Sequence, residues 1–334
     1  MLLSICIPNY KREESLENCL NSIYIAKKNF NLDFEVCISD NNSGASVSKI
    51  VNNYKSKFSI NFEKNRKNFG VGYNILKSVS LAKGKYSWII GNDDLLIPQA
   101  FKKLNKILNK KNIDFFYVNS FNLESEFVFK FKKKFNTNFI PKNLEKVSSQ
   151  KKNYHLSFFD LIHPDISFDY LMGSFLSIFR TSKWRENLNI IDKNLLIKKG
   201  VFSSFENTCP HVKIFAKAFS KSQAYLVASP LSVNLSGIRE WGNLWDFIEI
   251  IRMPQILDEY RKNGLSIFRY YYCKNNSLKN FIPCLLKIIF FRATKNYKYI
   301  SFYNHIVKNL IFINVYLSFF NFLYRKILIN KKNI

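Results

Sequence analysis

The chain of 334 residues carries the stretch GKYSWIIGNDDLLIP at positions 84–98. Within it, residues 86–90 form a short apolar run, which is typical of a strand buried on both faces of a parallel sheet. The run stops at Gly91-Asn92-Asp93-Asp94, and Pro98 follows where a helix is expected to begin. Ligands of parallel sheets bind at the carboxyl ends of the strands, so a carboxylate pair at this point predicts a ligand site.

Outward from this stretch, strand-like and helical patterns alternate over the first 120 residues. The patterns predict strands at 2–7, 34–39, 60–63, 86–90 and 114–118, and helices at 13–27, 47–54, 72–82 and 101–108. This alternation predicts an α/β fold with a mostly parallel central sheet flanked by helices. Asp40 ends the second predicted strand, so it is expected at the same sheet edge as Asp93 and Asp94.

Two common nucleotide-binding motifs are absent. The first predicted strand is followed by Pro8-Asn9-Tyr10-Lys11-Arg12, whereas a dinucleotide-binding fold places GxGxxG there, and no GxxxxGK[ST] occurs. The six cysteines include no CxxC pair and there are only four histidines, which argues against a zinc cluster. The N-terminus begins directly with an apolar strand, without the pattern of a signal peptide, and therefore predicts a cytoplasmic protein.

Five short motifs resemble glycosyltransferase family two, whose members have the GT-A fold. They are ICIPNYKR at 5–12, ISDNNS at 38–43, NFGVGYN at 68–74, AKGKY at 82–86 and GNDD at 91–94. Their order and spacing match the family. The resemblance covers the first third of the chain strongly and residues 170–235 weakly.

The resemblance implies a site for a nucleoside-diphosphate sugar and a divalent cation, Mn²⁺ or Mg²⁺. It assigns Asp94 to the metal and implies a contact between Asp40 and the nucleobase. The full set of implied donor-binding residues is Pro8, Tyr10, Arg12, Asp40, Asn68, Gly70, Asn74 and Asp93. Two positions depart from the family pattern: Asn92 replaces an acidic residue and Tyr73 replaces an arginine, for which Arg66 or Lys67 is a candidate substitute.

An inverting member of this family needs a general base for the acceptor hydroxyl. The family supplies it from an acidic pair before a helix, and here that position reads Phe205-Glu206-Asn207. Glu206 is therefore the first candidate base and His211 the second. Asp165 and Asp169 compete with them, and Trp241 and Trp245 are candidates for a lid over the nucleotide.

Residues 261–334 contain 14 basic side chains and no carboxylate. The apolar run 310–323 lies between Lys308 and Arg325, a span of 16 residues, which is shorter than the roughly 20 needed to cross a bilayer. This run and 281–291 are interpreted as amphipathic helices lying on a membrane surface. The alternative is a helical appendage packed on the catalytic domain.

Together these features predict three parts: a nucleotide-sugar-binding half at 1–120, an insertion with an acceptor-binding half at 121–240, and a helical, basic-aromatic region at 241–334. The expected protein is a metal-dependent, inverting glycosyltransferase of bacterial surface-glycan or lipooligosaccharide synthesis. Its acceptor is expected to be a glycan or lipid-linked glycan, and its location the inner face of the cytoplasmic membrane, with no nucleic-acid partner. The alternatives are a basic nucleic-acid-binding protein and a catalytically inactive scaffold.

Overall fold

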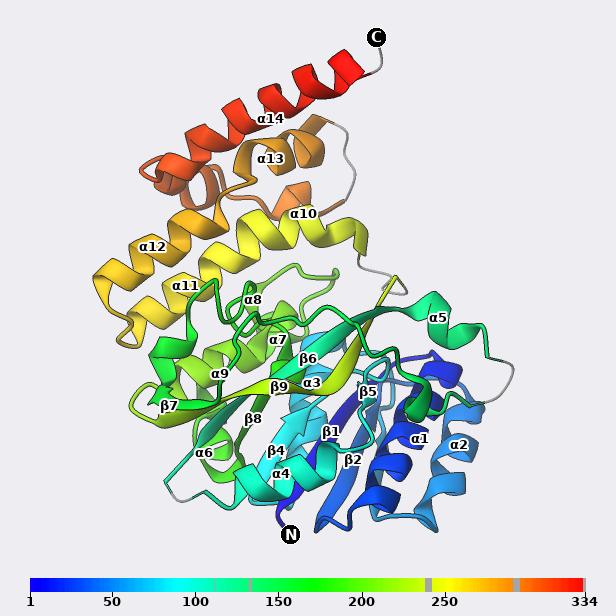
Figure 1. Cartoon of the computed structure of the whole chain (residues 1–334). Coiled ribbons are helices and arrows are strands. Elements are labelled where there is room, and N and C mark those ends of the chain that lie inside the picture. The colour runs from blue at the N-terminus through cyan, green and yellow to red at the C-terminus, as the bar shows by residue number, and fades with distance from the viewer. Residues whose placement is uncertain (111, 132–133, 238–241, 291–294, 333–334) are drawn as a thin grey trace.

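The computed structural model describes the whole chain except residues 111, 132–133, 238–241, 291–294 and 333–334. A twisted central sheet carries helices on both faces, and the C-terminal helices form a separate layer beyond one end of it (Figure 1).

The sheet has nine strands. They are β1 (Leu3–Asn9), β2 (Phe34–Asp40), β3 (Ile60–Lys64), β4 (Tyr86–Ile89), β5 (Leu95–Leu96), β6 (Phe115–Glu124), β7 (Tyr154–Ser157), β8 (Ser177–Arg180) and β9 (Gln223–Ser236). The helices are α1 (Glu13–Asn29), α2 (Ala45–Lys55), α3 (Val71–Ser80), α4 (Ala100–Leu108), α5 (Ser125–Phe129), α6 (Thr181–Glu186), α7 (Lys193–Leu196), α8 (Phe205–Thr208), α9 (Pro210–Ala218), α10 (Trp245–Phe247), α11 (Met253–Lys262), α12 (Ile267–Ser277), α13 (Phe281–Phe290) and α14 (Ile313–Lys332).

The strand order is β3-β2-β1-β4-β8-β6-β9-β5, with β7 paired to β9. The first four of these strands run parallel, as the alternating pattern predicts. Beyond them the sheet is mixed, because β8 lies between β4 and β6 and pairs antiparallel with both. The segments predicted as 1–120 and 121–240 therefore contribute strands to a single sheet.

Alternation along β1 divides the core between the two faces of the sheet. Leu3, Ile5 and Ile7 pack in the cluster that holds α1, α2 and α4, whereas Cys6 packs in the cluster that holds α3 and α9. Both faces are apolar, which explains why the first strand is a continuous hydrophobic run. Burial on both faces fixes the register of β1, and this register sets the position of its carboxyl end in the sheet.

The segment at 122–153, which lies in the predicted insertion, is partly built into the core. β6 continues to Glu124, and α5 follows it directly. Phe135 is fully buried, its amide donates to Asn18 Oδ1, and its carbonyl accepts from Asn21 of α1. The sequence pattern does not indicate this burial, because the few apolar side chains that anchor the segment lie among exposed lysines and other polar residues.

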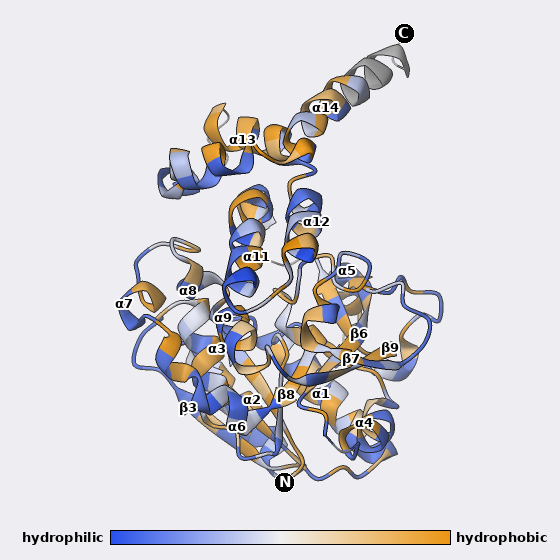
Figure 2. Ribbon diagram, turned by 90° about the vertical axis from the view of Figure 1, so that its left-hand side faces the viewer, coloured by the Kyte–Doolittle hydropathy of each residue, from blue (hydrophilic) through white to orange (hydrophobic). Residues whose placement is uncertain are grey.

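The C-terminal helices have a third core of their own. Phe247 and Ile250 from the run that begins at α10 pack with Phe281 of α13, and Val315 of α14 joins them. α13 is almost wholly apolar, with Lys287 as its charged residue, whereas apolar and polar residues alternate along α14 (Figure 2). No single helix among the described residues is long and apolar enough to cross a membrane, while residues 302–309 and 313–324 pass such a test only as a pair bent by 84°.

Candidate active site

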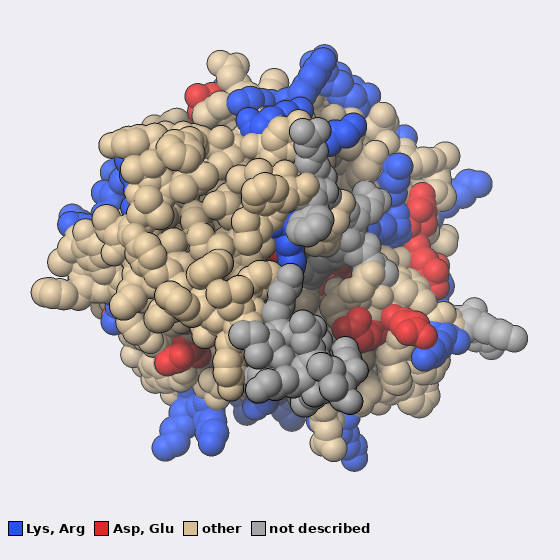
Figure 3. All heavy atoms as spheres, turned by 90° about the horizontal axis from the view of Figure 1, so that it is seen from above, with Lys and Arg blue, Asp and Glu red and all other residues tan. Residues whose placement is uncertain are grey.

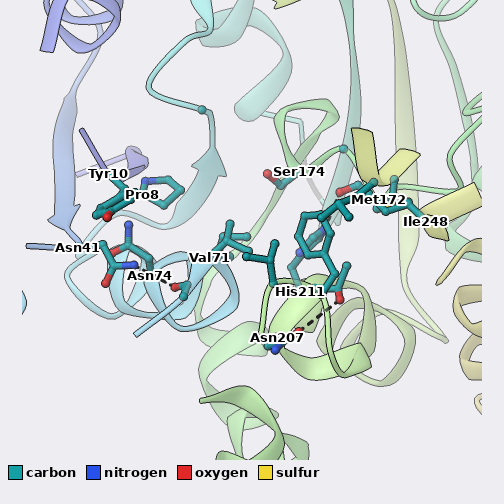
Figure 4. A pocket seen from close by; sticks show the side chains of 18 of the residues that line it. Pro8, Tyr10, Asn41, Val71, Asn74, Met172, Ser174, Asn207, His211 and Ile248 are labelled. Carbon is teal, nitrogen blue, oxygen red and sulfur yellow. Dashed lines mark hydrogen bonds between the residues drawn. The ribbon is translucent and has the colours of Figure 1, made fainter. Parts of the chain in front are cut away.

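A cavity of about 1390 Å³ opens at the carboxyl ends of β1, β2 and β4. One end is lined by Pro8, Tyr10, Asn41 and Asn74, and the opposite end by Met172, Asn207, His211 and Ile248 (Figure 4). Val71 and Ser174 lie between the two ends (Figure 4). We call the first the strand end and the second the helical end of the cavity.

The floor of the strand end is a chain of hydrogen bonds between neighbouring strands. Asn9 and Asp40 are register partners, and Asn9 Nδ2 donates to Asp40 Oδ1 over 2.8 Å. Asn92 Nδ2 in turn donates to Asn9 Oδ1 over 2.8 Å. Asn92, which replaces an acidic residue of the family pattern, therefore serves as a donor in a position where a carboxylate would have no proton to give.

Asparagine amides also form the wall of the strand end. Asn74 Nδ2 donates to the Asn9 carbonyl over 2.9 Å, and its Oδ1 accepts from Ser39 over 2.7 Å. Asn41 Nδ2 donates to Asn68 Oδ1 over 2.7 Å and to the Gly70 carbonyl over 3.2 Å. These contacts hold the loop 68–70 against β2, so its residues keep a fixed position along the cavity.

The charged side chains of the strand end are partly paired with one another. Arg12 Nη1 lies 3.1 Å from Asp93 Oδ2, and Asp94 Oδ2 accepts from the Gly91 amide over 2.7 Å. Lys67 also lines the cavity, whereas Arg66, the other proposed substitute for the missing arginine, does not. Arg12 and Lys67 are cations placed to meet an anionic ligand.

Most of the predicted donor-binding residues line this cavity, together with Asp94: they are Pro8, Tyr10, Arg12, Asn68, Gly70, Asn74 and Asp93. Asp40 does not line it. Its carboxylate is fully buried and accepts from Asn9 and from the Ser43 amide, the latter over 2.9 Å. Asp40 thus supports the floor, and Asn41, the next residue, lines the cavity instead.

Asp169 is a carboxylate that lines the cavity from the loop before Gly173. Its Oδ1 accepts from Ser167 over 2.6 Å, and its Oδ2 accepts from the Gly173 amide over 2.7 Å. Burial raises the pKa of this carboxyl above its ordinary value. Asp165, by contrast, is exposed beside His163 and lies outside the lining.

His211 lines the helical end from α9 and is buried. Its Nε2 lies 2.8 Å from the Met172 carbonyl, which can only accept, so Nε2 carries the proton. Nδ1 then presents a lone pair, and it has no hydrogen-bond partner within the described part of the chain. Burial lowers the pKa of His211 to about 4, which keeps the ring neutral at pH 7.

Glu206 is placed differently from the expectation. Its carboxylate is buried, accepts from Lys213 Nζ over 2.6 Å, and does not line the cavity. The ion pair with Lys213 gives this carboxylate a structural role, so the geometry does not support Glu206 as the base. The neighbouring Asn207 does line the cavity, and its amide is engaged by the loop 198–203.

The donor set of the strand end fits a divalent cation held jointly with a ligand. Among the described residues no three His, Cys, Asp or Glu side chains gather as a metal site. Asp93 and Asp94 are nevertheless adjacent oxygen donors at the cavity wall. Mg²⁺ and related cations are commonly bound by one or two carboxylates with substrate phosphates supplying the rest, and this pair suits that arrangement.

Sequence reasoning did not find a group of lysines at the helical end. Lys198 and Lys199 line it from the loop after α7, and Lys295 and Lys298 line it from the 3₁₀ helix η7 (Lys295–Tyr299). Nothing in the sequence places these two segments together, because they are about a hundred residues apart. Trp245, a proposed lid residue, also lines the cavity, while Trp241 lies outside the described residues.

A parallel α/β half that places paired carboxylates and cations at its strand ends, followed by a mixed sheet, defines a GT-A-like protein. The comparisons agree with this class. Residues 4–162, a little under half of the chain, match the model of Glycosyl transferase family 2, so this part of the chain is similar to that family.

Curated relatives match over part of their length. Abequosyltransferase RfbV of Salmonella typhimurium is 45% identical over 115 residues, which are 33% of this chain and 34% of that protein. The uncharacterized glycosyltransferase MJ1057 of Methanocaldococcus jannaschii is 29% identical over 123 residues, or 35% of this chain and 40% of that protein. The chain thus matches little more than a third of either relative.

Solved structures share the fold over most of the chain. TarS 1–349 of S. aureus in complex with UDP covers 90% of this chain and 76% of its own, with a TM-score of 0.55 and 14% identity. The same protein in complex with UDP-GlcNAc gives a TM-score of 0.53, with 14% identity, and covers 85% of this chain and 81% of its own. The likeness extends well beyond residue 162, so the mixed half of the sheet belongs to the shared fold.

Proposed function

We propose that the protein is a metal-dependent, inverting glycosyltransferase that moves a sugar from a nucleoside-diphosphate sugar to an acceptor hydroxyl in the synthesis of a bacterial surface glycan. The observation that carries this proposal is the cavity itself. Residues from four of the five family motifs meet at its strand end, and a buried carboxylate, Asp169, also lines it. Similarity to the abequosyltransferase supports a sugar as the transferred group.

In this proposal the nucleotide occupies the strand end. Tyr10 and Asn41 lie where a base can be held, and Asp40 acts as a positioning residue beneath them through Asn9. Arg12 and Lys67 meet the diphosphate. A divalent cation bound by Asp94 and Asp93 with the diphosphate would neutralise the charge that develops on the leaving group.

Transfer needs a base that removes the acceptor proton as its oxygen attacks the anomeric carbon and the nucleoside diphosphate departs. Asp169 is favoured, because it lines the cavity and burial raises the pKa of its carboxyl, which makes it a stronger base than an ordinary aspartate. His211 offers a free Nδ1, but its pKa of about 4 makes it a weak base. Glu206 is the third choice because it is paired with Lys213.

Side-by-side kinetics of three variants test this assignment. Asp169→Asn should lower kcat by roughly 10²–10⁴-fold, the range typical of a lost general base. Glu206→Gln and His211→Gln should keep most of the activity at neutral pH. An inactive His211→Gln beside a near-normal Asp169→Asn would transfer the role to the histidine, and the corresponding result for Glu206→Gln would return it to that residue.

The C-terminal helices are proposed to rest on a membrane that holds the acceptor. Large apolar side chains on them are exposed, among them Phe290, Phe302 and Ile311 at 74%, 72% and 70%. Seen from that end of the molecule, a broad uncharged area is bordered by Lys and Arg (Figure 3). Exposed apolar patches of this extent beside cations suit the headgroup region of an anionic lipid bilayer.

A thermal-shift panel of nucleoside diphosphates, with and without Mn²⁺, tests the donor site. One nucleotide should raise the melting temperature, and more so with Mn²⁺, because a ligand at 100 times its Kd stabilises by about 2.7 kcal/mol. Asp94→Asn should remove the Mn²⁺ increment. A panel in which no nucleotide shifts the transition would overturn the proposed function.

A further inference from the structure

The helical end of the cavity carries four lysines, Lys198, Lys199, Lys295 and Lys298. We call them the lysine group. None of them has a carboxylate within ion-pair distance among the described residues, unlike Lys213, which is paired with Glu206. All four are exposed at the cavity wall. Four like charges gathered without a counter-charge favour an anion at this place.

The loop that carries Lys198 and Lys199 is held in a defined shape. Asn207 Nδ2 donates to the carbonyls of Lys198 and Gly200 over 3.1 and 3.0 Å. Gly200 has φ +99°, and a Cβ there would lie 2.2 Å from the Tyr299 hydroxyl oxygen. The loop therefore favours glycine for its left-handed backbone, while the Tyr299 hydroxyl lies close against it.

The second pair of lysines is joined to the same loop. Asn296 Nδ2 donates to the Val201 carbonyl over 3.0 Å, and it lies between Lys295 and Lys298 on η7. Tyr299 lies between the pairs, with the ammonium groups of Lys198 and Lys298 at 6.0 and 5.1 Å from its ring centre. Two segments distant in sequence are thus bound together so that their lysines face one cavity.

The lysine group is distinct from the cations of the donor. Asn207 and Ile248 mark the helical end of the cavity, opposite Tyr10 and Asn41 (Figure 4). Asn207 holds the loop of Lys198, whereas the donor has Arg12 and Lys67 at the strand end. A second anionic group is therefore expected, and it belongs to the other substrate.

Apolar side chains surround this cationic group. Ile197 and Val201 flank the first two lysines, line the cavity and are 50% and 60% exposed. Leu244 and Ile248 line the same end and belong to the core of the C-terminal helices, the part of the chain with the exposed apolar surface. A ligand that meets both surfaces carries an anion next to a hydrocarbon.

We propose that the acceptor is a glycan joined through a phosphate or diphosphate to a long hydrocarbon, and that Lys198, Lys199, Lys295 and Lys298 bind that phosphate. This inference rests on the proposed function. It gives the acceptor its orientation: the phosphate lies at the helical end, the hydrocarbon follows the C-terminal helices, and the sugar points along the cavity toward Asp169 and the donor.

Calorimetric titration of the full chain with farnesyl diphosphate, below its micelle concentration, tests the inference. Inorganic pyrophosphate and farnesol are the parallel probes for the anion alone and the hydrocarbon alone. The variants are Lys198→Ala/Lys199→Ala and Lys295→Ala/Lys298→Ala. The matched control is Lys102→Ala/Lys106→Ala, two exposed lysines on α4 outside the cavity.

Farnesyl diphosphate should bind at least tenfold more weakly to each lysine-group variant and unchanged to the control, and farnesol binding should not differ between them. Lys67→Ala should show the reverse pattern, with weaker nucleoside-diphosphate binding and unaltered farnesyl diphosphate binding. Equal farnesyl diphosphate affinity in the wild type and the lysine-group variants would overturn the inference.

Two further outcomes separate this inference from the proposed function. If the lysine-group variants lose nucleoside diphosphates and farnesyl diphosphate together, the lysines serve the donor and the inference is wrong. If the wild type binds nucleoside diphosphates but not farnesyl diphosphate, the inference fails while the proposed function stands. Pyrophosphate binding equal to that of farnesyl diphosphate would refute a lipid-linked anion in favour of a free one.

Discussion

At the scale of single residues, Asn207 explains why the acidic pair of the family pattern is incomplete here. Its Nδ2 donates to two carbonyls and lies 2.7 Å from Ser203 Oγ, while its Oδ1 accepts from the Ser204 amide over 3.2 Å. An ionised aspartate has no proton to donate, so it would face the carbonyls of Lys198 and Gly200 with a negative charge. The asparagine therefore builds the loop of the lysine group.

Asn207→Asp should accordingly destabilise the protein and should not raise kcat. These carbonyls are partly buried, and leaving a buried carbonyl without a donor costs about 1–3 kcal/mol, so urea denaturation should show a loss of up to about that size. Asn105→Asp, at an α4 side chain whose oxygen accepts from Asn109, is the control and should be near neutral. An increase in kcat in Asn207→Asp would mean that the position is a lost base rather than a structural donor.

His211 should make the stability of the fold depend on pH. Its pKa is lowered by burial to about 4, so between pH 6.5 and 4 the unfolded chain binds a proton that the folded chain does not. The free energy of unfolding should therefore fall as pH drops through this window and level off above pH 6.5.

Urea denaturation at pH 7 and pH 5 measures this effect. His211→Gln should lose less stability on acidification than the wild type, and the exposed His155→Gln should behave like the wild type. Burial also lowers the pKa of His305 to about 4, so part of the dependence should remain. An identical pH dependence in His211→Gln and the wild type would contradict the account.

The residue scale is also where the sequence was least informative. Motif position indicates Asp40 as a nucleobase contact and Glu206 as a base. In the structure, however, Asp40 accepts a hydrogen bond from Asn9, and Glu206 accepts one from Lys213. Motif position predicts which backbone segment reaches the site. It does not predict whether a side chain turns into the cavity or supports its floor, because neighbours from other segments decide that.

At the scale of elements, the close approach of α3 to α8 fixes the strand end against the helical end. A Cβ on Gly72 would lie 2.6 Å from the Glu206 carbonyl oxygen and 2.9 Å from Asn207 Cα. Both neighbours are backbone atoms, which cannot swing aside as a flexible side chain does. The glycine in the third motif therefore serves packing between helices.

Gly72→Ala should destabilise the protein by about 1–3 kcal/mol, the range for overpacking a close contact. Urea denaturation measures it, with Gly44→Ala as control, because a Cβ at Gly44 meets nothing closer than 3.5 Å. The alanine should also loosen the loop that Asn207 holds. A Gly72→Ala protein as stable as the control would show that the two helices are free to separate.

Elements with strong periodicity were predictable, and those defined by distant partners were not. β1 and α1 agree with their predicted ranges to within about two residues, because both are continuous apolar or amphipathic patterns. The insertion of β8 between β4 and β6 was not foreseen. Four residues, Ser177–Arg180, carry too little pattern to indicate their neighbours or direction.

At the scale of the whole molecule, the charge and the apolar surface of the C-terminal region point to one binding face. Residues 261–334 hold 14 basic side chains and no carboxylate. Sequence composition predicted this region's helices and charge, while the structure adds that Phe290 and Phe320 remain exposed, at 74% and 63%. Helices that served only to pack on the catalytic domain would have buried these two phenylalanines.

Pelleting with vesicles that contain anionic lipid should therefore recover the protein, and less of it as salt rises. Phe290→Ser/Phe320→Ser should reduce binding severalfold. Phe139→Ser, at a residue 61% exposed in the N-terminal half, should leave it unchanged. If RNA displaces the protein from vesicles and the double variant binds them normally, the region binds nucleic acid rather than lipid.

The strand end of the cavity is proposed to bind and activate a nucleoside-diphosphate sugar. The most direct measurement is release of nucleoside diphosphate from a panel of nucleotide sugars with Mn²⁺, by the wild type and by Asp94→Asn, without added acceptor. Slow release from one nucleotide sugar is expected for the wild type, and none for a folded Asp94→Asn protein. No release from any nucleotide sugar, or equal release by the variant, would contradict this proposal.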